Sequence, residues 1–266
     1  MSYDRNFSLQ NGEIIYTDTI YFDRNIFIYA TNGKYPKLVD VINLCKKNGK
    51  IFPYSPAHME EIVKAITEGH SECENDIELI KDLSGEMAFC PVEDYDTRLI
   101  CYPVIECRYN VEKDSGREQT ELARDMDADE KEIHKWMRDN IEFKKVFDEC
   151  KHCQWDNIFD QECIQKYLKF ENIEQPKDGY QFTFQRRESL ITKLYKLLDL
   201  FGFRVEDSDV HIENRMHDIS HIIYASSAEI FVSNDKKLRD KAKAIFKFLS
   251  IPTSVMNCEE FITTFK

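Results

Sequence analysis

The chain has 266 residues, of which 42% are hydrophobic and 32% charged, and its formal net charge is −13. This length and composition suffice for a sizeable buried core and exclude a disordered chain. The acidic balance argues against a broad basic surface that grips nucleic acid, although 36 Lys and Arg residues leave room for a local basic groove.

The chain shows no sign of export or of membrane insertion. Residues 1–13 lack the apolar stretch of a signal peptide, and no apolar run approaches the length that crosses a bilayer. The nine cysteines are scattered and odd in number, so we expect free thiols. These features predict a cytoplasmic protein that does not act at a membrane.

The first part of the chain alternates between strand and helix patterns. Residues 20–29 are predicted to form a buried strand that runs into a turn, and residues 50–54 a second, short strand. The helix that begins at Pro36 has apolar residues at the i, i+3, i+4 and i+7 positions, and Ser55-Pro56 is a good start for the next helix. This alternation is typical of a parallel sheet covered by helices.

The middle of the chain differs from both ends. Residues 89–109 contain two short extended stretches, whereas residues 125–150 and 187–201 have the periodicity of helices. We therefore expect a mainly helical insertion at residues 82–213. It would separate the first half of an α/β core, residues 1–81, from the second half, residues 214–266.

The last part of the chain repeats the alternating pattern. Residues 218–228 are predicted to be helical, with Asp218 at the start, and residues 229–233 to be a strand. A Lys-rich helix follows at residues 235–249. A last strand at 253–256 and a last short helix at 258–265 complete the expected core.

Acidic residues fall at positions where such a core would gather them. Asp23 lies within or at the end of the first strand, Asp235 follows the strand near the C-terminus, and Asp218 begins the preceding helix. Glu60 and Glu61 lie in the helix after the second strand. Ligands bind beyond the carboxyl ends of parallel strands, and clustered carboxylates repel one another unless a cation or protons compensate. The pattern therefore predicts a site for a divalent cation such as Mg²⁺.

Three motifs together resemble those of PIN-domain nucleases. Asp23-Arg24-Asn25 resembles the opening D-x-N motif, and residues 55–62 resemble the helix that runs from a serine to a glutamate. Asp218, followed by Ser233-Asn234-Asp235, resembles the final D…(T/S)-x-D motif. The resemblance covers residues 1–80 and 210–266, and the long insertion departs from a compact PIN domain.

This resemblance implies a fold and an activity. The fold would be a three-layer α/β/α PIN-like core with a parallel sheet, and the activity that of a metal-dependent endonuclease acting on RNA rather than DNA. Mg²⁺ or Mn²⁺ ions would be held by four catalytic acids: Asp23, Glu61, Asp218 and Asp235. Asn25 and Ser233 would support the site by hydrogen bonding, and Glu60 remains an alternative to Glu61 because helical geometry places it nearer the apolar stripe.

A harmful cytoplasmic nuclease needs restraint, so the resemblance also suggests a toxin or defence effector. Its expected partners are RNA and, in addition, an inhibitory protein or a second copy of the chain. Two other functions remain open: an inactive PIN-like scaffold, or another α/β hydrolase acting on small phosphate esters. Metal-dependent cleavage of a polymer distinguishes the nuclease from both.

Other features have simpler explanations. His58, His217 and His221 lie near the acids, but buried histidines are more often structural than catalytic. Cys150 and Cys153 have a CxxC spacing, yet no second pair completes a zinc site. The lysines of residues 236–247 either guide a phosphate backbone or form a solvated helix face.

Overall fold

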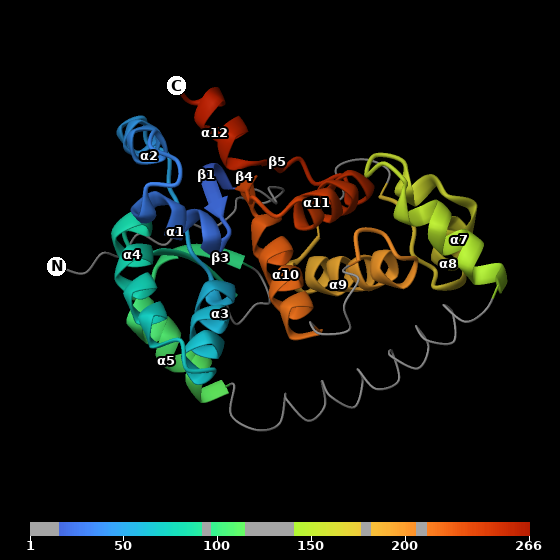
Figure 1. The fold of residues 1–266 in the computed structure, drawn as a ribbon, viewed down its shortest axis with the longest axis horizontal. Coiled ribbons are helices and arrows are strands. Elements are labelled where there is room, and N and C mark those ends of the chain that lie inside the picture. Colours follow the sequence, from blue (N-terminus) through green and yellow to red (C-terminus); the bar gives the residue numbers. More distant parts are fainter. Residues whose placement is uncertain (1–15, 92–96, 115–140, 177–181, 206–211) are drawn as a thin grey trace.

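The computed structural model describes residues 16–91, 97–114, 141–176, 182–205 and 212–266 of the chain. It is a mixed α/β structure with a parallel sheet of three strands in the order β1-β4-β5. The strands are β1 (Tyr16–Phe22), β4 (Ala228–Val232) and β5 (Ser254–Met256). Strand β1 pairs with β4, so segments from near the two ends of the chain lie side by side (Figure 1).

Most of the remaining described chain is helical. The helices that follow β1 are α1 (Arg24–Asn32), α2 (Leu38–Lys47), α3 (Pro56–Thr67), η1 (Ser71–Glu74) and α4 (Asn75–Ser84). A hairpin of β2 (Met87–Pro91) and β3 (Thr97–Cys101) precedes α5 (Val104–Asp114), α7 (Ile141–Lys151), η2 (Ile158–Asp160), α8 (Glu162–Phe170) and α9 (Phe184–Leu200). Around the last strands lie α10 (Ile212–Ala225), α11 (Lys236–Leu249) and α12 (Cys258–Thr264). Within these residues, no helix is both long and apolar enough to span a bilayer.

Alternate residues of the central strands face two different apolar clusters. Tyr21 and Phe231 belong to a cluster that includes residues of α9, α10 and α11. Phe22 and Val232 belong to a second cluster, which includes residues of α1, α2, α3 and α12. Because successive side chains of a strand point to opposite faces, helices cover the sheet on both sides.

The predicted insertion does not have a core of its own. Phe89 and Leu99 of the β2–β3 hairpin and the apolar face of α9 belong to the same cluster as Tyr21 and Phe231. Val104 and Cys107 of α5 belong instead to the second cluster, with Phe22 and Val232. The described part of residues 82–213 therefore contributes to the core on both faces of the sheet, and α7 and α8 extend the molecule away from the sheet (Figure 1). The domain boundaries stay a prediction.

Three sequence expectations about local structure were wrong. Strand β1 ends at Phe22, and residues 24–32 form helix α1 instead of continuing the strand, because the Asp23 carboxylate accepts the Ile26 N–H at 3.1 Å and caps a helix. Residues 50–54 form only two isolated bridges, from Ile51 to Thr19 and from Tyr54 to Ala88. The predicted helix at 125–150 is not one of these errors, because its described part is helical from residue 141 and residues 125–140 lie outside the described part.

The third error concerns Asp218, which the sequence placed at the start of a helix. Helix α10 begins at Ile212, so Asp218 lies within it and does not cap it. Its carboxylate instead accepts a hydrogen bond from the hydroxyl of Tyr195 on α9, at 2.9 Å. The predicted helices at 36–48, after Ser55, at 235–249 and at 258–265 are present to within a few residues.

Candidate functional site

The candidate site begins where the parallel strands end. The N–H of Asp23, directly after β1, donates to the carbonyl of Val232 at the end of β4 at 3.0 Å. This bond holds Asp23 beside Ser233, and both side chains are buried. The carboxyl ends of β1 and β4 therefore meet, as the sequence pattern requires.

Ser233 links two of the predicted acids. Its hydroxyl donates to the Asp23 carboxylate, and its oxygen accepts the backbone N–H of Asp235 at 3.1 Å. Asp235 is exposed and caps α11 by accepting the N–H of Leu238 at 3.0 Å. The supporting role predicted for Ser233 is consistent with these contacts.

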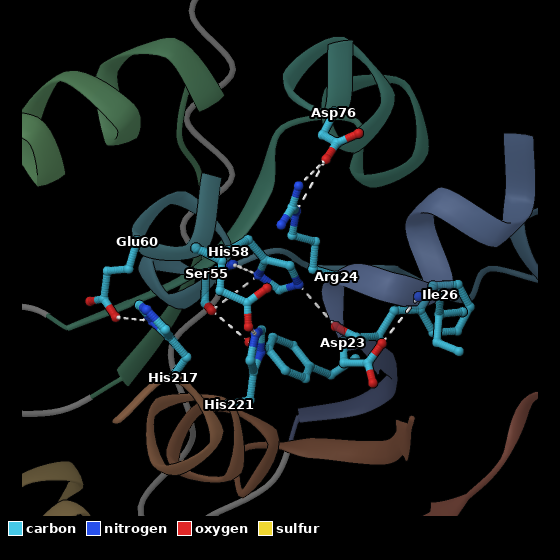
Figure 2. Close-up of polar contacts among 12 residues, drawn as sticks. Asp23, Arg24, Ile26, Ser55, His58, Glu60, Asp76, His217 and His221 are labelled. Atoms are coloured by element: carbon cyan, nitrogen blue, oxygen red, sulfur yellow. Dashed lines mark hydrogen bonds and ion pairs between the residues drawn. The ribbon is translucent and has the colours of Figure 1, made fainter. Parts of the chain in front are cut away.

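Glu61 approaches the same region from α3. Its Oε1 lies 3.1 Å from Nε2 of His221 on α10, in a contact that is largely buried on the histidine side. Glu60, the alternative, points instead toward His217, with 3.9 Å between Oε2 and Nδ1 (Figure 2). Of the two glutamates, Glu61 is the one whose charge acts on Asp23.

A chain of buried polar groups extends from Glu61 into the core. Nδ1 of His221 lies 2.9 Å from the Tyr21 hydroxyl, which lies 2.6 Å from Oγ of Ser55. At the far end of the chain, Nδ1 of His58 accepts the N–H of Ser55 at 3.1 Å. Because this nitrogen is an acceptor, His58 is neutral, and its Nε2–H donates to the carbonyl of Phe22 at 2.9 Å.

His58 and His221, the two histidines in this row of buried polar groups, have opposite electrostatic environments. Burial and the nearby charge of His221 lower the pKa of His58 to about 3. Burial also opposes the charge on His221, but attraction to Glu61, Asp23 and Asp218 outweighs it and raises the pKa of His221. Conversely, burial would raise the pKa of Glu61, but attraction to His221 and the hydrogen bond with it outweigh burial and lower the pKa to about 2. Glu61 and His221 are therefore a charged pair.

The pKa values of Asp23 and Asp218 are raised, in contrast to the lowered pKa of Glu61. Burial, assisted by repulsion from Glu61, raises the pKa of Asp23 to about 6, although Ser233, His221 and the Ile26 N–H oppose this. Burial and repulsion from Asp235 raise the pKa of Asp218 to about 6, against the hydrogen bond from Tyr195. Each of these acids is thus destabilised in its charged form, and in each case a second predicted acid contributes to the effect.

These electrostatic effects connect the four predicted acids. Asp23 interacts with Glu61, Asp218 interacts with Asp235, and His221 interacts with Asp23, Glu61 and Asp218. In the part of the chain that is described, no three His, Cys, Asp or Glu side chains converge closely enough to form a ready metal cluster. Mg²⁺ usually binds through one or two carboxylates and keeps several waters, so this donor set fits a hydrated ion.

Two further predicted features are Asn25 and the lysines of α11. Asn25 is exposed in the first turn of α1 and lines a cleft together with Asp235 instead of contacting Asp23. Several lysines of α11 have structural partners: Lys241 pairs with Asp199 at 2.5 Å and Lys243 lies 5.8 Å from the Trp155 ring. These contacts favour a structural role for that part of the lysine run.

The cysteines form no zinc site in the described structure. The Sγ atoms of Cys150 and Cys163 lie 3.6 Å apart, whereas Cys153 donates to the side chain of Asn157 at 3.0 Å. Cys150 and Cys153 therefore have different partners, and no group of three or more His, Cys, Asp or Glu side chains that could hold a metal is found among the described residues.

Sequence reasoning missed two residues that shape the site. Tyr21 contacts His221, and Tyr195 contacts Asp218. Tyr21 is two positions before Asp23 in the segment that the sequence predicts as a strand, so strand periodicity would place both on one face of that predicted strand. Tyr195 lies in the predicted insertion and has no comparable signal. Searches of protein-family models, curated proteins and solved structures find no significant match to this chain.

Proposed function

We propose that this protein is a metal-dependent endonuclease that hydrolyses phosphodiester bonds, with RNA as its substrate. One observation supports the proposal above all others: the acids that follow β1 and β4 and those on α3 and α10 act on one another in pairs or through His221, near the carboxyl edge of the sheet. A phosphodiesterase site needs such a concentration of oxygen ligands. The choice of RNA comes from the resemblance of the motifs to those of PIN-domain nucleases.

A divalent cation fits the chemistry of this site. Asp23 and Asp218 are held in surroundings that penalise their negative charge, and a cation removes that penalty by binding the ionised carboxylate. Asp23, Asp218 and Asp235 are the residues that would hold Mg²⁺ or Mn²⁺, with Glu61 at one side. The bound ion would activate a water molecule and stabilise negative charge on the leaving oxygen.

The protein's own groups would then position and tune the reaction. Ser233 orients Asp23 and fixes the backbone at Asp235. The charged His221 holds Glu61 and offsets part of the negative charge of the site. Because Glu61 is already paired with His221, we assign it to orienting the site rather than to tight ligation. The arrangement as a whole is what we expect of a three-layer PIN-like core.

Cleavage assays test the proposal. Purified protein with Mn²⁺ is expected to cut RNA and to be inactive in EDTA. Asp23→Asn and Asp235→Asn should each reduce the rate by about 10²–10³-fold, the loss expected when an electrostatic contact to the transition state is removed. Asp40→Asn, an exposed acid on α2, is the matched control and should leave the rate unchanged.

The outcomes separate the remaining alternatives. Cleavage of single-stranded DNA but not RNA would overturn the choice of substrate while keeping the reaction. Turnover of a small ester such as p-nitrophenyl phosphate without polymer cleavage would indicate another phosphoester hydrolase. Absence of any metal-dependent hydrolysis would indicate a scaffold and contradict the proposal.

A further inference from the structure

A cleft of about 500 Å³ opens beside Asp235. Residues of α1 and the loop after it contribute Asn25, Tyr29, Lys34 and Tyr35 to its lining, and the start of α11 contributes Asp235 and Arg239. This volume falls within the roughly 300–1,000 Å³ of small-molecule pockets. The cleft shares Asp235 with the candidate site, so whatever binds in it lies next to the acids.

Two tyrosines form an aromatic surface in this cleft. The rings of Tyr29 and Tyr35 have centroids 5.7 Å apart and an interplanar angle of 56°, and both side chains are partly exposed. Nδ2 of Asn234 donates to the Tyr35 hydroxyl at 3.0 Å and thereby orients that ring. Exposed tyrosine rings that are held in place offer a surface on which a planar base can stack.

Two cationic groups accompany the tyrosines. Nζ of Lys34 lies 3.9 Å from the centre of the Tyr29 ring, and Nη1 of Arg239 donates to the Ser233 carbonyl at 2.8 Å. Lys34 is thus placed by the aromatic surface, and Arg239 is placed by the segment that carries the acids. Glu259 also lines the cleft, so the lining has two cations against two carboxylates, one of which, Asp235, belongs to the proposed metal site.

We propose that this cleft binds one nucleotide of a single-stranded nucleic acid, with its base against Tyr29 and Tyr35 and a phosphate beside Lys34 and Arg239. The inference rests on the proposed function, since it places this nucleotide next to the bond that is cut. A base inside a duplex is stacked on its neighbours and does not reach such a surface, so the cleft selects single strands. The polar amides around it offer hydrogen bonds without requiring one particular base.

Binding in EDTA tests the cleft independently of cleavage. A fluorescein-labelled oligouridylate of about ten nucleotides, within the site sizes of such grooves, is titrated with the full chain and followed by anisotropy. Tyr29→Leu and Tyr35→Leu should each weaken binding by about five- to hundredfold, the range for loss of one stacked base. Tyr109→Leu, an exposed tyrosine on α5 outside the cleft, is the matched control and should bind like the wild type.

The salt dependence of binding tests the proposed contact between Lys34 and a phosphate. Lys34→Ala should reduce the slope of log K against log salt by about 0.7–1, as expected for one lost phosphate contact. Lys47→Ala, an exposed lysine on α2, should leave the slope unchanged. Thermal unfolding of all variants at the wild-type temperature shows that the fold is intact.

The outcomes distinguish failure of the cleft from failure of the nuclease proposal. If the wild type cuts RNA and the tyrosine variants bind and cut like the control, the cleft is not the nucleotide site although the function stands. If binding weakens as expected but no metal supports cleavage, the cleft stands and the nuclease proposal falls. The same oligouridylate annealed to its complementary strand is titrated as a duplex probe. No binding to the single strand, or equal binding to this duplex, overturns the assignment of the cleft.

Discussion

Glu61 and His221, 160 positions apart in the chain, form an ion pair with 3.1 Å between Oε1 and Nε2. The pair joins α3, from the first half of the chain, to α10, from the last part, next to Asp23. It therefore contributes both to the stability of the fold and to the electrostatics of the candidate site.

Removing the charge of Glu61 should destabilise the protein. Glu61→Gln leaves a buried histidine without its partner, and we expect a loss of about 1–3 kcal/mol, below the 3–5 kcal/mol of a fully buried pair because His221 can lose its proton. Urea unfolding measures the loss. Glu60→Gln, at the neighbouring and more exposed position, is the control and should change stability by less than about 0.5 kcal/mol.

The pH dependence of this loss follows from the two pKa shifts. The lowered pKa of Glu61 stabilises the folded state above the ordinary glutamate value of 4.5, and the raised pKa of His221 stabilises it below the ordinary histidine value of 6.5. The difference between wild type and Glu61→Gln should thus be largest between these values and shrink as the pH rises through the pKa of His221. The charged pair would be contradicted if the stability difference between wild type and Glu61→Gln instead grew above pH 7, by about as much as the variant loses in total.

The pKa values of His58 and His221 should be shifted in opposite directions from the ordinary histidine value. The lowered pKa of His58, about 3, keeps this histidine uncharged at neutral pH, whereas His221 should remain charged above pH 6.5, the ordinary histidine value. NMR titration of the imidazole C–H resonances, assigned with His58→Gln and His221→Gln, measures both. A single shared transition near the ordinary value would show that the two environments are alike.

Asp23→Asn should make the protein more stable at neutral pH. The pKa of Asp23 is raised from 3.8 to about 6, so its ionisation costs stability as the pH rises through this interval, and above it the full cost remains. A shift of this size corresponds to about 3 kcal/mol. Asparagine keeps the cap for Ile26 and removes the charge. Unfolding at pH 4 and pH 8 should show a gain at pH 8 alone.

The same variant separates function from stability. If Asp23 is kept for catalysis, Asp23→Asn gains stability and loses cleavage, which is the trade-off common at active sites. Asp40→Asn should change neither property. Reduced stability of Asp23→Asn at pH 8 would mean that the carboxylate is a structural anchor.

Tyr195 should tune Asp218 without touching substrate. Its hydroxyl donates to the Asp218 carboxylate at 2.9 Å and lowers the pKa of that group. Tyr195→Phe removes the donor, so the pKa of Asp218 should rise above about 6, and the acidic limb of the pH–rate profile should move to higher pH. Rates at high pH should recover, whereas a purely structural defect would lower the rate equally at all pH values.

Divalent cations should stabilise the wild type against heat. At a Mn²⁺ concentration of a hundred times Kd, binding to the folded state adds about 2.7 kcal/mol. Asp218→Asn and Asp235→Asn should reduce this gain, and KCl at the same ionic strength should not reproduce it. Equal gains in wild type and in both variants would place the metal elsewhere.

Sequence reasoning recovered the elements whose signals are local. The helix after Ser55 and the helix after Asp235 have capping residues and apolar periodicity, and both form where predicted. It failed at residues 24–32, where apolar β-branched and aromatic residues suit a strand and a helix alike, and the capping by Asp23 decides for the helix.

The candidate site depends on contacts that periodicity does not reveal. The order of motifs placed Asp23 and Ser233-Asn234-Asp235 at strand ends, and the pairing of β1 with β4 brings these ends together. The pairing of Glu61 with His221 and the bond from Tyr195 to Asp218 arise from how helices pack across large sequence separations. A single sequence gives no measure of such packing.

The pairing of β1 with β4 has a consequence for biosynthesis. Tyr21 lies opposite Phe231, so the first strand lacks its partner β4 until the ribosome has added more than two hundred further residues. The acidic edge cannot assemble on a shorter nascent chain, because Asp218, Ser233 and Asp235 are translated late. If the protein has the proposed nuclease activity, that activity would therefore be absent throughout translation, while the protein is closest to its own messenger RNA.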